Sequence, residues 1–264
     1  MALLLPASAL ADPLQDRRPQ RIVSLNLCAD QLLIALADRS QIAGLTPNAP
    51  DPSLSAAAAR VRGLPVLRQS AEQVLAIRPD LLIGMAMQHN AIMAVLKDQH
   101  YRTLDLPSAR NFPQIATQIR RLAQAIGQPA RGAALVHRME AELARLPQPG
   151  RGRVAAYYQR RGFLTGTDTL VDDLMQRVGL VNLAARLGKP PLSQLSLEEL
   201  VAARPDFLIV DSGTDEVTDQ GTEMLHHPAL AGIPRIALPQ AWTVCGGPAY
   251  VNAARRLAQA LTEY

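Results

Sequence analysis

The sequence predicts an α/β protein made of two Rossmann-like lobes with parallel sheets, joined by one long α-helix. The first indication is an internal repeat: residues 70–83 read SAEQVLAIRPDLLI, residues 196–209 read SLEELVAARPDFLI, and eight of the fourteen positions are identical. The second is the alternation of short apolar runs with helical segments, which is typical of parallel sheets. The third is a helical stretch over 129–146, which at 1.5 Å per residue would reach roughly 27 Å.

Each copy of the repeat carries its own start and stop signals. The Ser-x-Glu triplet at Ser70 and at Ser196 predicts a helix N-cap followed by an acidic first turn. The Arg-Pro pair that follows ends the helix, because proline disfavours the α conformation at the residue before it. A short apolar run then predicts a buried strand. We therefore expect each copy to be a helix-strand unit at the same place in its own lobe.

The N-terminal lobe is expected over 21–110. Its predicted strands cover 21–25, 42–45, 80–83 and a stretch near 101–104. A turn is expected at 26–30, with helices over 31–37 and 91–97 and a loop at 84–90. Residues 111–147 form the predicted connecting helical segment, in which Gly127 and Pro129 mark the end of one helix and the start of the next.

The C-terminal lobe is expected over 148–264. Strands are predicted at 153–158, 206–210 and 235–238, helices at 169–178 and 249–262, and a surface turn at His226 and His227. Two lobes of roughly 100 residues each are ordinary sizes for compact domains. A ligand tends to bind between such lobes.

Composition limits the classes of function. The chain has 264 residues, a formal net charge of +4 and only 3% aromatic residues. Its basic residues are scattered, so nucleic acid is not an expected partner. The N-terminus reads MALLLPASALADP, and we interpret residues 1–11 as a signal peptide cleaved after Ala11; a frayed apolar end is the alternative. We expect a periplasmic, monomeric protein.

Ligand-contacting residues are predicted from one rule of open α/β sheets, which bind ligands beyond the carboxyl ends of their strands. This rule selects the segments 26–30, 85–89, 157–163, 211–214 and 242–246. Aromatic and arginine side chains in them suit large ligands that carry acidic groups. The candidate ligand-binding residues are Asn26, Cys28, Met85, Met87, Tyr157, Arg160, Trp242 and Cys245.

Several of these residues allow more than one interpretation. Met85, Met87 and His89 could ligate copper or haem iron, but a Met pair is more often adaptable packing surface. Arg160 and Arg161 are either ligand contacts or solvated loop charges, and Trp242 is either in the cleft or in the core. Cys28 and Cys245, the only cysteines, form a disulfide, stay as buried thiols or face the ligand. No protein-bound metal or cofactor is expected.

Taken in order, these motifs resemble the periplasmic solute-binding proteins of ABC importers that carry ferric siderophores, haem and cobalamin. The resemblance rests on RIVSLNLCADQLLIALA at 21–37, both repeat copies, TGTDTLVDDLMQRVGLVN at 165–182 and the last helix after Trp242. It implies that the cargo is an iron or cobalt chelate held between the lobes, with a ferric siderophore favoured and cobalamin close behind.

The resemblance also implies a partner, an ABC permease with its ATPase at the inner membrane. One glutamate on each lobe would dock onto arginines of that permease, and the matching residues are Glu72 and Glu198. Two exposed carboxylates on paired lobes would steer and register such a partner. The alternative is that both glutamates merely stabilise the N-termini of their helices.

Two other classes of protein compete with the importer. A regulatory or scaffold protein of the envelope would keep the lobes and bind no small molecule. A nitrogenase-like metallocluster enzyme would need several cysteine ligands, and the chain has two. G-x-S-x-G, H-E-x-x-H and P-loop motifs are missing from the sequence, so we do not expect an enzyme.

Overall fold

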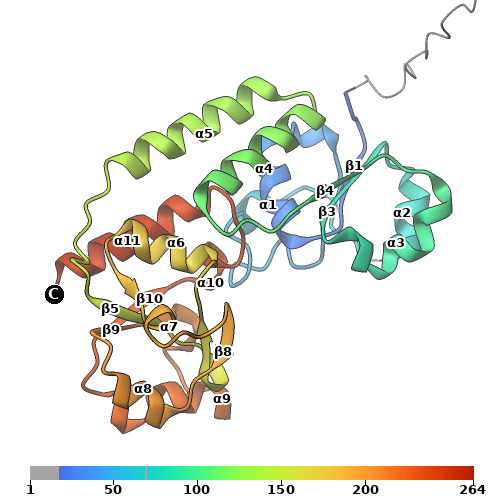
Figure 1. The fold of residues 1–264 in the computed structure, drawn as a ribbon. Helices are drawn as coiled ribbons and strands as arrows, with labels where there is room; N and C mark the ends of the chain where they lie inside the picture. Colours follow the sequence, from blue (N-terminus) through green and yellow to red (C-terminus); the bar gives the residue numbers. More distant parts are fainter. Residues whose placement is uncertain (1–17, 69) are drawn as a thin grey trace, which may run out of the picture.

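The computed structural model describes residues 18–68 and 70–264. The predicted signal peptide, residues 1–11, lies outside the described residues. Figure 1 shows two α/β lobes, with a long helix, α5, running along one side of both. The fold class predicted from the repeat is therefore confirmed, with two parallel sheets and helices packed on them.

The N-terminal lobe is built on a four-stranded parallel sheet in the order β2-β1-β3-β4. Its strands are β1 (Ile22–Ser24), β2 (Ile42–Gly44), β3 (Leu81–Met85) and β4 (Thr103–Leu106). Its helices are α1 (Leu27–Leu36), α2 (Ala71–Ile77) and α3 (Ala91–Leu96). Every residue of β1 is buried, as expected for a central strand covered on both faces.

The C-terminal lobe repeats this sheet in the order β10-β9-β5-β7, again parallel throughout. Its strands are β5 (Val154–Tyr157), β7 (Val181–Asn182), β9 (Phe207–Asp211) and β10 (Arg235–Leu238). A small antiparallel pair, β6 (Phe163–Thr165) and β8 (Leu192–Gln194), lies beside it. The helices are α6 (Leu170–Arg177), α7 (Leu183–Arg186), α8 (Leu197–Ala203), α9 (Gln220–Glu223), α10 (Gln240–Thr243) and α11 (Ala249–Thr262).

The two copies of the repeat fold alike down to their hydrogen bonds. Both helices end on an arginine in the left-handed region, Arg78 at φ 49° and Arg204 at φ 46°. The aspartate after each Arg-Pro pair then accepts a backbone N–H at the start of the neighbouring central strand: Asp80 from Arg21, and Asp206 from Val154. The repeat motif therefore orients the helix and aligns its strand with the next one.

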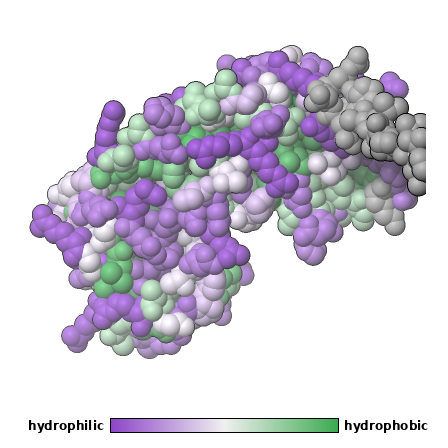
Figure 2. Space-filling view, turned by 45° about the horizontal axis from the view of Figure 1, so that its top comes forward, coloured by the Kyte–Doolittle hydropathy of each residue, from purple (hydrophilic) through white to green (hydrophobic). Residues whose placement is uncertain are grey.

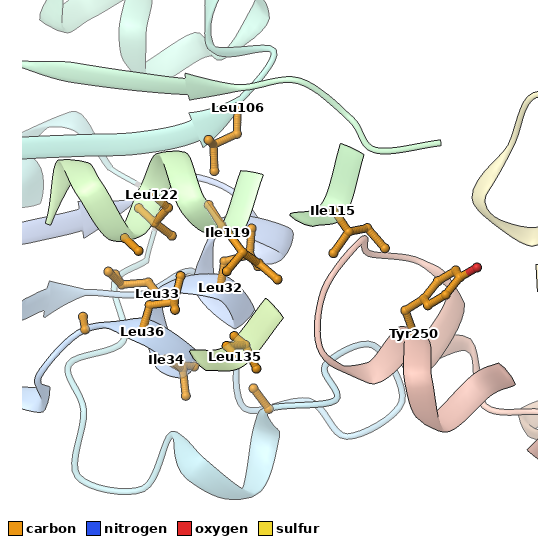
Figure 3. Packing of buried hydrophobic residues seen from close by; sticks show 14 of the residues in the cluster. Leu32, Leu33, Ile34, Leu36, Leu106, Ile115, Ile119, Leu122, Leu135 and Tyr250 are labelled. Carbon is orange, nitrogen blue, oxygen red and sulfur yellow. The ribbon is translucent and has the colours of Figure 1, made fainter. Parts of the chain in front are cut away.

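The connection between the lobes consists of two packed helices, α4 (Phe112–Ala125) and α5 (Pro129–Ala144). They approach closely at Gly132, where a Cβ atom would lie 2.4 Å from the Cβ of Ala123. The glycine that interrupts the helical pattern is thus explained by this contact. α4 also packs on α1, and Figure 3 shows its Ile119 and Leu122 lying near Leu32 and Leu33.

The hydrophobic core of the N-terminal lobe continues into α11, the last helix of the chain. Tyr250, Val251 and Ala254 belong to the same buried cluster as α1 and α4, and Figure 3 shows Tyr250 beside Ile115. Further along the same helix, Leu257 and Leu261 join the core of the C-terminal lobe. One helix therefore packs into both lobes and holds them together.

Three local predictions were wrong. The first helix begins at Leu27, not at residue 31, because Asn26 caps it by accepting from the backbone N–H groups of Cys28 and Ala29. β3 extends through Met85 into the predicted loop. β7 and the β6–β8 pair were not expected, because these strands are two or three residues long and carry no clear alternation.

Candidate functional site

A hollow of about 430 Å³ opens at the carboxyl end of the C-terminal sheet. Tyr157 ends β5, Asp211 ends β9 and Gln240 begins α10 after β10, so three parallel strands lead into it. Figure 2 shows the surface indented between the lobes, with hydrophilic side chains along its rim. The other lining residues are Gln159, Arg160, Arg161, Phe163 and Thr214.

Two arginines of this hollow differ in their partners. Arg160 forms an ion pair with Asp219, and a backbone hydrogen bond from Thr222, together with Arg160, holds the pKa of Asp219 below its usual range. Arg161 lies at φ 59° in the left-handed region. Within the described part of the chain, its guanidinium makes no ion pair or hydrogen bond. The charge of Arg161 is therefore available to an acidic group of a ligand.

The wall of the hollow combines aromatic and polar groups. Tyr157 is buried, and its hydroxyl lies 3.1 Å from the Oγ1 atom of Thr243 in α10. Burial raises the pKa of Tyr157, so the phenol stays neutral. Phe163 is half-buried and provides an apolar surface beside it. Tyr157 and Arg160, both predicted from the sequence, are thus brought together in one site.

The predicted residues of the N-terminal lobe lie at the carboxyl end of its own sheet, and their side chains have different environments. Asn26 is committed to capping α1, and Met85 is half-buried against the core. Met87 is only 5% exposed, because its side chain packs over Gly84 and into a buried cluster. A ligand contact by Met87 stays a prediction, and Tyr157, which lines the hollow, is equally little exposed, at 4%. His89, next to it in the 3-10 turn Met87–His89, is exposed.

The two cysteines form a disulfide between Cys28 and Cys245. Of the three alternatives for this pair, the disulfide is correct, so neither residue can act as a thiolate toward a ligand. Cys28 lies in the first turn of α1, and Cys245 lies just after α10. The bond therefore crosses from the N-terminal lobe to the C-terminal segment that packs against it.

Trp242 is half-buried and packs against the core of the N-terminal lobe, although α10 belongs to the C-terminal lobe. It is next to Thr243, the partner of Tyr157. The indole is thus a packing residue between the lobes, and of α10 it is Gln240 that lines the hollow. A role of Trp242 in ligand contact stays a prediction.

Glu72 and Glu198 occupy the same position in α2 and α8, and both are exposed. Ser70 and Ser196 cap the two helices by accepting from the backbone N–H groups of Gln73 and Glu199. The side chain of Glu199 accepts in turn from the backbone N–H of Ser196. Hydrogen bonds from its own backbone amide and from Ser70 lower the pKa of Glu72, so it is charged at neutral pH. A docking role for this pair stays a prediction.

Sequence reasoning missed Gln240 and did not single out Gln159, Phe163, Asp211 or Thr214. All but Gln240 lie in segments that the strand-end rule had selected, although these residues were not chosen within them. Gln240 was missed because α10 begins two residues before the segment that was expected. In the part of the chain that the structure describes, no cluster of three or more His, Cys, Asp or Glu residues is able to hold a metal ion.

These features define a two-lobed α/β protein with a hollow at the carboxyl end of its C-terminal sheet. The periplasmic binding protein family matches residues 22–237, and the chain belongs to it. No helix within residues 18–68 and 70–264 combines the length and apolar character needed to cross a membrane.

Among solved structures, the chain is similar to the periplasmic haem-binding protein of Roseiflexus sp. RS-1 in its apo form, with a TM-score of 0.75, 27% identity and coverage of 92% of this chain and 98% of the other. It also shares its fold with the periplasmic vitamin B12 binding protein of Vibrio cholerae, with a TM-score of 0.69, 17% identity and coverage of 93% and 98%.

Among curated relatives, the cobalamin-binding protein of Halobacterium salinarum is 23% identical over 208 residues, which are 76% of this chain and 56% of the relative. An uncharacterised ABC transporter substrate-binding lipoprotein of Bacillus subtilis is 23% identical over 211 residues, which are 75% of this chain and 65% of the relative. The chain thus spans somewhat over half the length of the curated relatives it matches.

Proposed function

We propose that this protein captures an iron or cobalt macrocycle between its lobes and delivers it to an ABC permease. The observation that carries the proposal is the hollow at the ends of β5 and β9, where Arg161 lies beside Tyr157 and Phe163. A flat, partly apolar ligand that carries acidic groups would satisfy both kinds of side chain.

Haem is the first candidate cargo. It bears two carboxylates that arginine recognises in a bidentate way, and the haem-binding protein of Roseiflexus is similar over nearly its whole length. Cobalamin is the second candidate, supported by the cobalamin-binding relative from Halobacterium. A ferric siderophore, the first expectation from the sequence, stays a prediction that none of these similarities supports specifically.

Delivery to a permease is supported by the pair Glu72 and Glu198. Both carboxylates are exposed at matching positions of the repeat, one on each lobe, and the helix N-caps are Ser70 and Ser196. A partner with two basic sites would meet both at once, which gives orientation as well as attraction. The lipoprotein of Bacillus subtilis, which is described as part of an ABC transporter, supports the same partner class.

A titration of the purified protein tests the cargo. Hemin, cyanocobalamin and a panel of ferric siderophores are each added while Trp242 fluorescence and ligand absorbance are followed, and equilibrium dialysis confirms the stoichiometry. We expect saturable binding of one chelate, with a Kd in the micromolar range or tighter. The variant Trp242→Phe separates indole quenching from binding itself. A folded protein that binds none of these compounds would favour the envelope scaffold.

A further inference from the structure

The internal repeat also includes residues on the N-terminal side of its most similar segments, 70–83 and 196–209. Aligned without a gap, residues 64–69 precede Ser70 as residues 190–195 precede Ser196. In this stretch Pro65 matches Pro191, and Val66 matches Leu192. Each lobe therefore has a proline followed by an aliphatic residue, six positions before the glutamate of the same copy.

Both aliphatic side chains are exposed. Val66 is 42% exposed and Leu192 is 63% exposed, and the prolines before them are exposed as well. Single exposed aliphatic residues are normal on protein surfaces. Two of them at equivalent positions of an internal repeat, next to a proline in each case, are harder to explain by chance.

Both pairs are held rigidly by the same kind of hydrogen bond. The carbonyl of Pro65 accepts from the backbone N–H of Leu45 at 2.9 Å, and the carbonyl of Pro191 accepts from that of Gly166 at 2.8 Å. Val66 continues this contact as a bridge to Leu45, and Leu192 pairs with Thr165 in the β6–β8 pair. Their side chains therefore present fixed apolar surface, which costs little entropy to bind.

The exposed glutamate of each copy follows its apolar pair in the chain, and in the first copy the exposed Arg68 lies between them. The segment from Val66 leads directly into α2 and Glu72, and the segment from Leu192 leads into α8 and Glu198. In the first copy, the backbone N–H of Arg68 donates to the side chain of Gln73 at 2.7 Å, which ties this segment to the first turn of α2. Figure 1 places α2 and α8 on different lobes, at opposite ends of the molecule.

We infer that the Pro65–Val66 and Pro191–Leu192 pairs are the apolar halves of two equivalent docking sites, whose acidic halves are Glu72 and Glu198. The inference rests on the proposed delivery to a permease. The partner that fits is a membrane permease with two equivalent recesses, each with an apolar floor beside a basic group. Protein interfaces usually have an apolar centre, with polar and charged groups around it.

Site-specific photo-crosslinking in native cells tests this surface. Benzoylphenylalanine replaces Val66 or Leu192 in the full exported chain. Val95, which is 61% exposed on α3, and Val217, which is 55% exposed in the C-terminal lobe, provide matched controls outside the repeat. We expect positions 66 and 192 to crosslink to the same integral membrane protein, and the two control positions to give no such product.

Uptake and binding assays on substituted proteins complete the test. The double variant Val66→Ser with Leu192→Ser should raise the amount of carrier needed for half-maximal uptake of haem or cyanocobalamin about tenfold, with ligand affinity unchanged. If this variant and the crosslinks are without effect while Glu72→Gln with Glu198→Gln still blocks uptake, the apolar halves are wrong and the permease partner stands. If neither pair of substitutions affects uptake, the docking function itself is wrong. A loss of ligand affinity in Leu192→Ser would assign this residue to the cleft and overturn the inference.

Discussion

Cys28 and Cys245 are joined by a disulfide although they lie 217 positions apart in the chain. The bond connects the first turn of α1 in the N-terminal lobe to the segment between α10 and α11. The same junction holds Trp242 and the first half of α11, both packed on the N-terminal core. Covalent and hydrophobic contacts therefore act together where the lobes meet.

Removal of this bond should destabilise the protein. The loop-closure model assigns up to about 5 kcal/mol to a loop of this length, and measured losses are typically about 2–5 kcal/mol. Cys28→Ser with Cys245→Ser should lower the free energy of unfolding in urea by that amount. Reductant should shift the midpoint of the native protein toward that of the double variant and leave the variant unchanged. Equal midpoints for the native protein with and without reductant would contradict the prediction.

Gly246, the residue after Cys245, packs closely against Ala109 and Ile115. A Cβ atom on Gly246 would lie 2.7 Å from the Cβ of Ala109 and 3.1 Å from the Cγ1 of Ile115, whereas one on Gly247 would meet Leu32 at an ordinary 3.7 Å. Gly246→Ala should therefore cost about 1–3 kcal/mol of stability by overpacking, and Gly247→Ala should cost much less. Thermal unfolding of both variants measures the difference, and equal losses would show that the contact relaxes freely.

Asp30 should make the free energy of unfolding increase as the pH falls. It is fully buried in α1, and burial raises its pKa to about 6, against hydrogen bonds from Thr46 and Ser24 that lower it. A carboxyl group whose pKa is raised on folding binds its proton more tightly in the folded state. The stability contributed by this group therefore increases as pH falls through 6 toward the unfolded value near 3.8.

The expected gain from Asp30 between pH 7.5 and pH 4.5 is about 2 kcal/mol by linkage. Other carboxylates, such as Asp38, have lowered pKa values and oppose it. The difference in unfolding free energy between the native protein and Asp30→Asn isolates the contribution of Asp30, because asparagine does not titrate. A difference that stays constant over this pH range would mean that Asp30 is ionised throughout.

Arg161 should contribute to ligand affinity through its charge. Arg161→Gln is expected to weaken binding of an acidic chelate such as haem about tenfold, which corresponds to one charge-assisted hydrogen bond. Arg151→Gln is the matched control, because Arg151 also adopts a positive φ, 50°, and lies outside this hollow. Equal affinities for the two variants would remove Arg161 from the site.

The glutamate pair should affect delivery and not capture. Glu72→Gln with Glu198→Gln is expected to reduce ligand uptake at least about fivefold, because two charge pairs with the permease are lost, and to leave the Kd for ligand unchanged. Glu223→Gln is the control, since Glu223 is also an exposed glutamate in the first turn of a helix, α9. A parallel fall in ligand affinity would place the glutamates in the binding site instead.

Local sequence signals by themselves determined the repeat units and the places of the main strands along the chain. Ser70 and Ser196 cap their helices, Arg-Pro ends them, and the last helix occupies the range expected from its pattern, Ala249–Thr262. Such features depend on neighbours in the chain, through hydrogen bonds and steric limits that span a few residues. The rule for the carboxyl ends of strands selected two segments, 157–163 and 211–214, that line the hollow.

Only the tertiary structure decided which side chains in those loops line the hollow. Met87 and Met85 are two residues apart, yet one packs over Gly84 and the other is half-buried. Asp219, from a distant segment of the chain, forms its ion pair with Arg160 and not with Arg161. The pairing of Cys28 with Cys245 depends on α10 and α11 lying against the other lobe. Contacts between residues far apart in the chain are set by the packing of whole elements, which local patterns do not encode.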